Sequence, residues 1–117
     1  MPNSPDDAAP VDRTELAEIS GGDRSIEQQM LAVFRRANDA DVAAFRQALA
    51  KRDVAAVKRC SHRIKGAGTM VGAKALAGIC ERIEQAGHAG DWGTVAAQGE
   101  ALYRELDRVY AYLGTLA

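Results

Sequence analysis

The stretch DVAAVKRCSHRIKGAGTMVG, residues 53–72, decides the fold of this chain. Asp53 is a good helix N-cap, and the residues after it predict a helix that runs to about residue 69 and is closed by Gly72. Each helical residue advances by about 100°, so apolar residues spaced three and four apart gather on one side. This predicted core stripe consists of Val57, Cys60, Ile64, Ala67 and Val71.

His62 lies on the side of the helix opposite to the predicted core stripe, so we expect its imidazole to face solvent. Lys65 and Gly66 are its neighbours one turn later. Gly66 is costly in a helix interior, by about 1 kcal/mol relative to alanine. A histidine that must stay open to a bulky group or to an approaching protein would explain this glycine. His62, Lys65 and Gly66 therefore form the candidate site.

The candidate site suits phosphoryl transfer onto a histidine. An attacking imidazole must be neutral, and nearby cations disfavour the protonated form. The same cations attract a phosphoryl group and stabilise it once it is attached. Residues 51–65 contain six basic side chains and one acidic side chain, Asp53. This segment is therefore a local basic patch, although the net charge of the whole chain is -1.

Before residue 53 the chain predicts a short helix and a long one. Residues 12–20 form the short helix, which the Gly21–Gly22 pair ends. Asp23 or Ser25 caps the long helix, which has a weak point at residues 38–41 where we expect a kink. Its predicted apolar face consists of Ile26, Met30, Val33, Ala37, Val42, Phe45 and Leu49.

Two more helices follow residue 72, over residues 73–88 and from Asp91 to the C-terminal region. The first has an apolar face at Leu76, Ile79, Cys80 and Ile83, and the last has a seam at Trp92, Val95, Gly99, Leu102, Leu106, Val109 and Leu113. Spacings that alternate between three and four are typical of helices in bundles. Because short connections make neighbouring helices antiparallel, we expect an all-α, up-down-up-down four-helix bundle capped by the short N-terminal helix.

Composition limits the class of protein. The chain has 117 residues, enough for one domain, and 47% of them are hydrophobic, enough for a globular core. The net charge gives no overall attraction to nucleic acid or to a membrane. Cys60 and Cys80 are expected to be buried, reduced thiols. The sequence shows neither a secretory signal pattern nor an apolar stretch of membrane-spanning length, so we expect a cytoplasmic location without membrane insertion.

The chain is expected to divide into a tail and a domain. Residues 1–11, MPNSPDDAAPV, are rich in proline, aspartate and alanine, a composition typical of a disordered tail or linker. Residues 12–117 then form the bundle domain.

Residues 62–72 resemble the signature of the histidine-containing phosphotransfer (Hpt) domains of bacterial two-component phosphorelays. The family pattern is a histidine, any residue, leucine or isoleucine, lysine, glycine, alanine or serine, three residues of any type, an aliphatic residue and a glycine. The segment His62–Gly72 fits this pattern throughout. The resemblance extends over about residues 14–113.

The resemblance implies a four-helix bundle that is phosphorylated on His62. It also implies that Lys65 contacts the phosphoryl group and that Gly66 keeps the histidine accessible. One position departs from the family, because some members have a glutamine on the next helix where this chain has Glu84. A carboxylate there would repel a phosphoryl group, so no site role is carried over to Glu84.

The resemblance further implies the partners of the domain. It would accept a phosphoryl group from a receiver-domain aspartate of a hybrid sensor kinase and pass it to another response-regulator aspartate. It would be a monomeric phosphoryl carrier with no cofactor and no ATP-dependent kinase activity of its own, and Mg²⁺ would belong to the receiver. The linker-like start favours a cytoplasmic domain cut from the C-terminal end of a larger hybrid kinase over a free-standing protein.

Three other functions stay open. A helical protein-interaction module would leave His62 without any phosphate chemistry. Nucleic-acid binding through the basic patch lacks interleaved aromatic residues and a recognisable DNA-binding motif. The phosphoacceptor domain of a chemotaxis-type kinase would take its phosphate from a kinase domain and ATP instead of from a receiver.

Overall fold

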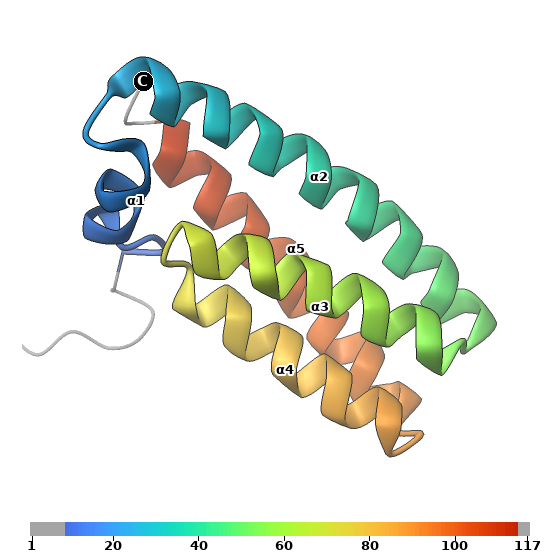
Figure 1. Cartoon of the computed structure of the whole chain (residues 1–117). Helices are drawn as coiled ribbons and strands as arrows, with labels where there is room; N and C mark the ends of the chain where they lie inside the picture. Colours follow the sequence, from blue (N-terminus) through green and yellow to red (C-terminus); the bar gives the residue numbers. More distant parts are fainter. Residues whose placement is uncertain (1–8, 115–117) are drawn as a thin grey trace, which may run out of the picture.

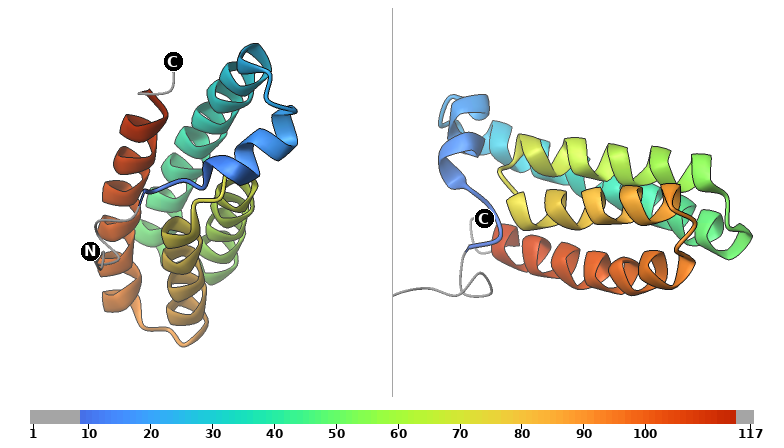
Figure 2. Two further views of the ribbon diagram at one scale, coloured as in Figure 1. Left: turned by 90° about the vertical axis from the view of Figure 1, so that its left-hand side faces the viewer. Right: turned by 90° about the horizontal axis from the view of Figure 1, so that it is seen from below.

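The structure, a computed structural model, describes residues 9–114 apart from the side chains of Arg13 and Leu16. Its five helices are α1 (Arg13–Ser20), α2 (Arg24–Lys51), α3 (Val54–Met70), α4 (Lys74–His88) and α5 (Trp92–Gly114). The four long helices form an antiparallel bundle, and α1 lies across one end of it (Figures 1 and 2). The predicted four-helix bundle with a short N-terminal helix is confirmed.

Aspartates begin four of the five helices in the described range. The carboxylates of Asp12, Asp23, Asp53 and Asp91 each accept a hydrogen bond from a backbone N–H two or three residues later, at 2.9–3.1 Å. These bonds satisfy N–H groups that have no partner inside the helix. These four predicted helix starts are therefore correct. Helix α4 begins at Lys74, and its N-cap residue, Ala73, has no side chain that could form such a bond.

The α3–α4 turn holds the N-terminal segment against the end of the bundle. Gly72 has a φ of 74°, and the backbone N–H of Asp12 donates a hydrogen bond to its carbonyl at 3.1 Å. This bond places Val11, which is 3% exposed, in the hydrophobic core. Val11, the last residue of the predicted tail, is thus packed against the bundle, while residues 1–8 of that tail lie outside the described residues.

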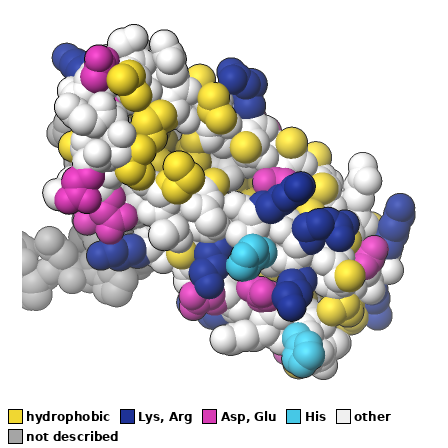
Figure 3. All heavy atoms as spheres, viewed as in Figure 1, with side chains coloured by type: hydrophobic (Ala, Val, Ile, Leu, Met, Phe, Trp, Pro, Cys, Tyr) yellow, Lys and Arg dark blue, Asp and Glu magenta, His cyan; other side chains and the backbone are white. Residues whose placement is uncertain are grey.

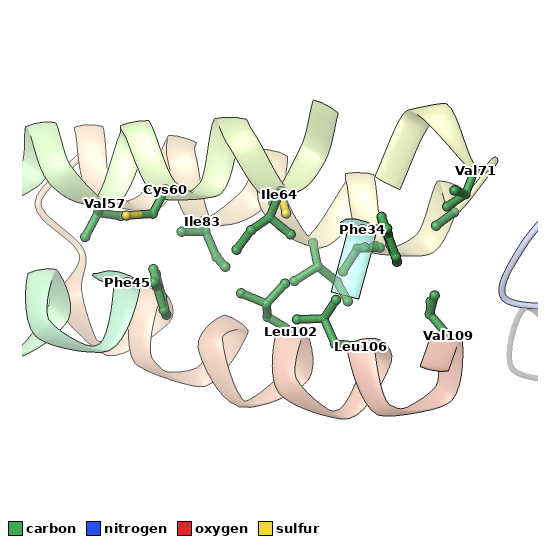
Figure 4. Packing of buried hydrophobic residues seen from close by; sticks show 14 of the residues in the cluster. Phe34, Phe45, Val57, Cys60, Ile64, Val71, Ile83, Leu102, Leu106 and Val109 are labelled. Atoms are coloured by element: carbon green, nitrogen blue, oxygen red, sulfur yellow. The ribbon is translucent and has the colours of Figure 1, made fainter. Parts of the chain in front are cut away.

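The core lies between the four long helices (Figure 4). The α3 stripe is buried except for Ala67, which is half-buried, and the predicted faces of α4 and α5 are buried except for the half-buried Trp92. Cys60 and Cys80 are free, buried thiols as predicted. Burial raises the pKa of the Cys80 thiol to about 12, so it is inert at neutral pH.

The first half of α2 buries a different face from the one predicted. Ile26 and Val33 are 44% and 57% exposed, whereas Phe34 and Asn38 are buried. Burial of the Phe34 ring removes more apolar surface from water than burial of Val33 would. This difference explains why the first half of α2 buries the face that carries Phe34. The helix runs without interruption through residues 38–41, where a kink was expected.

Gly99 of α5 allows α2 and α5 to approach closely. A Cβ atom at this position would lie 3.0 and 3.3 Å from two ring carbons of Phe45, which is fully buried. We expect Gly99→Ala to lower the free energy of unfolding by about 1–3 kcal/mol, because the ring has no space into which to move. Urea denaturation measures this change.

The matched control is Gly93→Ala, at an exposed position of the same helix where an added Cβ makes only ordinary contacts. It is expected to leave stability unchanged or to raise it. Equal stability of the two variants would contradict the close approach of Gly99 and Phe45.

Candidate functional site

Helix α3 carries all three predicted site residues and lies between α2 and α4 (Figure 1). Ile64 is fully buried and Cys60 is 4% exposed, so one side of the helix is committed to the core. His62 is exposed on the opposite side, as the spacing predicted. The imidazole is therefore available to a partner that approaches the bundle from the side.

Gly66 has no packing reason to be a glycine. It has an ordinary helical backbone, and a Cβ atom added to it would meet no other atom within 4 Å. Gly68, two residues later, differs: its Cβ would lie 3.0 Å from a methyl carbon of Leu76, a fully buried residue of α4. Gly68 thus serves the contact between α3 and α4, whereas the bare backbone of Gly66 faces outward, one turn after His62.

Lys65 is turned towards α4. Its Nζ atom lies 3.0 Å from Oε1 of Glu81, and 32% of its side chain is exposed. The hydrogen bond that Lys65 donates to Glu81 raises the pKa of Lys65, and the negative charges of Glu81 and Glu84 act in the same direction. The lysine therefore carries its positive charge at neutral pH.

Sequence reasoning missed Glu81. Glu81 and Glu84 are three residues apart on α4, a spacing that puts them on one outward face of that helix. The three-residue spacing in the sequence was the signal that could have pointed to Glu81. It did not reveal the register of α4 against α3, which decides which of the two carboxylates meets Lys65.

Arg63 is turned in the other direction, towards α2. Its Nη1 atom lies 3.7 Å from Oδ1 of Asp41. Lys58 and Arg59 are exposed, and neither forms an ion pair with another described residue. Figure 3 shows a histidine with lysine, arginine and acidic side chains around it on this face. The site is thus mixed in charge, with cations on both sides of α3.

A shallow groove of about 530 Å³ separates the outward faces of α3 and α4. Glu84, which departs from the family pattern, lines this groove together with Lys65 and Glu81. The complete lining consists of Lys58, Lys65, Glu81, Glu84, Gln85 and His88. Within residues 9–114, no cluster of three or more His, Cys, Asp or Glu side chains could hold a metal ion.

An apolar groove of about 490 Å³ lies on the other side of α3, against α2. Met70 and Val33 at its rim are 55% and 57% exposed, and hydrophobic side chains gather on this part of the surface in Figure 3. Met70 is thus one of the exposed large hydrophobic side chains of the described residues. Ala73, the N-cap residue of α4, is fully buried and contributes nothing to this surface.

The sequence model of the Hpt domain family matches residues 29–112. The chain belongs to the Hpt domain family. Hpt domains are phosphoryl carriers of phosphorelays that interact with receiver domains and are not kinases. No match was found among curated proteins.

The Hpt fold is also seen in a comparison with solved structures. The chain is similar to the crystal structure of histidine-containing phosphotransfer protein B (HptB) from Pseudomonas aeruginosa PAO1, with a TM-score of 0.83. The match covers 93% of this chain and 96% of HptB at 23% sequence identity. At this identity the likeness establishes the shared fold. None of the helices in the described range of this Hpt domain is long and apolar enough to cross a bilayer.

Gly66 and Gly68, two residues apart on α3, should respond in opposite ways to replacement by alanine. Gly66→Ala is expected to raise the free energy of unfolding by about 1 kcal/mol, because alanine favours the helix and meets open space. Gly68→Ala is expected to lower it, because the added methyl group presses on Leu76. Urea denaturation of both variants provides the test. A loss of stability in Gly66→Ala would show that Gly66 has a packing role after all.

Proposed function

We propose that this Hpt domain accepts a phosphoryl group from the aspartyl phosphate of a receiver domain onto His62 and passes it to the aspartate of another response regulator. The proposal is supported chiefly by the exposed position of His62, opposite the core side of α3, with the bare backbone of Gly66 beside it. A helix interior gains no stability from that glycine, so access to the histidine is its most direct explanation.

The proposed step exchanges one bond to phosphorus for another. The lone pair of one imidazole nitrogen of His62 forms the N–P bond while the bond from phosphorus to the aspartate oxygen breaks. The electron pair of the broken bond leaves with the aspartate carboxylate. The second ring nitrogen keeps its proton or releases it to water. The reverse exchange, with a second receiver aspartate as nucleophile, discharges the domain.

The cations near His62 fit the charge of such a step. Phosphoryl transfer depends mainly on positioning and on neutralising negative charge. Lys65 supplies an ammonium group one turn from the histidine, and Lys58 and Arg59 lie one turn before it. We propose that Lys65 contacts the phosphoryl group and that the other two attract the acidic face of a receiver.

The receiver would also use the apolar surface beside the site. Met70 lies eight residues after His62, about 12 Å further along the helix axis, within reach of a docked domain. We propose that the receiver covers the groove that Met70 and Val33 border, with Mg²⁺ held by the receiver itself. In this scheme the Hpt domain acts as a monomer in the cytoplasm.

Replacement of His62 tests the proposed function. We expect native protein, incubated with a phosphorylated receiver domain and Mg²⁺, to gain a phosphate that is labile in acid and stable in alkali. His62→Gln should gain none, whereas His88→Gln, with the second histidine of the chain replaced, should label like the native protein. Labelling that persists in His62→Gln would show that the phosphate is attached to a residue other than His62.

The identity of the phosphoryl donor distinguishes the alternative functions. A kinase domain with ATP that labels His62, where receivers fail, would indicate the phosphoacceptor domain of a chemotaxis-type kinase. A native chain that no receiver and no kinase labels would favour a helical interaction module.

A bulkier residue at position 66 should block access without harming the fold. Gly66→Gln introduces a good helix former into open space, so stability should equal or exceed that of the native protein. We expect transfer from the receiver to His62 to slow by at least about tenfold, because the new side chain occupies the approach to the imidazole. Rapid-quench measurements give the rate. Native-like transfer by a folded Gly66→Gln variant would refute the access role.

A further inference from the structure

The ion pair between Lys65 and Glu81 presents the proposed mechanism with a conflict. Lys65 is the cation that would contact the phosphoryl group, yet its Nζ atom already lies 3.0 Å from Oε1 of Glu81. A phosphoryl group carries close to two negative charges. It would therefore compete with the carboxylate of Glu81 for the same ammonium group.

We propose that Glu81 is a positioning residue that competes for Lys65 and thereby makes the phosphohistidine easier to discharge. The proposal rests on the proposed function, since it assigns a role in phosphoryl transfer at His62. In the unphosphorylated domain Glu81 holds Lys65 against α4. When His62 is phosphorylated, Lys65 must leave Glu81 to reach the phosphoryl group, and the loss of the ion pair offsets part of the new contact.

The exposure of the pair makes this exchange feasible. The Lys65 and Glu81 side chains are 32% and 54% exposed, and ion pairs at such positions are held weakly because water solvates both charges. After Lys65 leaves, the Glu81 carboxylate would be solvated by water and would not remain as an unpaired buried charge. A buried pair would behave differently, since its rupture leaves an uncompensated charge in the interior.

Glu84 does not have the same relation to Lys65. It lines the same groove and acts on Lys65 through its charge, but among the described residues only Glu81 forms an ion pair with the lysine. The short contact singles out Glu81. The effect of Glu81 on the discharge of phosphohistidine should accordingly require Lys65.

A double-mutant cycle measures this dependence. The variants are Glu81→Gln, Lys65→Met and the double variant, with Glu100→Gln, an exposed glutamate on α5, as a control for the loss of one surface charge. Each protein is first phosphorylated with phosphoramidate. The phosphorylated variant is then mixed with an unphosphorylated receiver domain and followed until equilibrium. A variant that accepts the phosphoryl group slowly from a receiver can therefore still be measured.

We expect Glu81→Gln to shift this equilibrium towards phosphohistidine by about twofold to fivefold, because Lys65 is then free to bind the phosphoryl group. The shift should vanish when Lys65 is methionine, and Glu100→Gln should show none. In NMR titrations of unphosphorylated protein, Glu81→Gln should lower the pKa of Lys65, a readout that needs no phosphoryl transfer.

Two outcomes would overturn the inference alone. Labelled native protein whose equilibrium is unchanged by Glu81→Gln would show that the ion pair has no role in transfer. An equal shift in the Lys65→Met background would show that Glu81 repels the phosphoryl group directly. A native chain that takes no phosphate on His62 from phosphoramidate or from a receiver would instead refute the proposed function, and this inference with it.

Discussion

One helix, α3, has to bury one side completely and leave the opposite side bare, and the rest of the bundle is arranged around that requirement. Ile64 and His62 are only two residues apart, yet the first is fully buried and the second faces solvent. Helices α2 and α4 pack against the flanks of α3 and leave its outer face open. Gly68 brings α4 close enough for this by removing a side chain that would press on Leu76.

The same arrangement distributes the charges of α3. The chain is nearly neutral overall, but residues 51–65 are strongly basic. The neighbouring helices supply acids that pair with two of these cations, Asp41 from α2 with Arg63 and Glu81 from α4 with Lys65. Such pairing limits the repulsion between like charges on one helix while leaving Lys58 and Arg59 solvated. The outer face is therefore positive without being dominated by a single block of unpaired cations.

Much of the fold could be predicted because it follows from local rules. Aspartate caps give the starts of the helices, and on α3, α4 and α5 the apolar spacing matches the buried faces. The prediction failed on α2, where Val33 and Phe34 both suit a core and only tertiary packing decides between them. Val11 was missed because it is held in place by a backbone hydrogen bond from Asp12 to Gly72, 60 positions further along the chain. Exposure of His62 followed from helical geometry, whereas the Lys65–Glu81 contact depends on the register between two helices.

A carrier differs from an enzyme or a receptor in what its site must do, because tight binding of the phosphoryl group would stop the relay. The balance between capture and release is best set by contacts that are individually weak and reversible. Ion pairs at a solvated surface have this property, since salt and water reduce the attraction between their charges. The placement of Lys65 between solvent and α4, instead of in an enclosed pocket, therefore suits a group that must be held briefly and then given up.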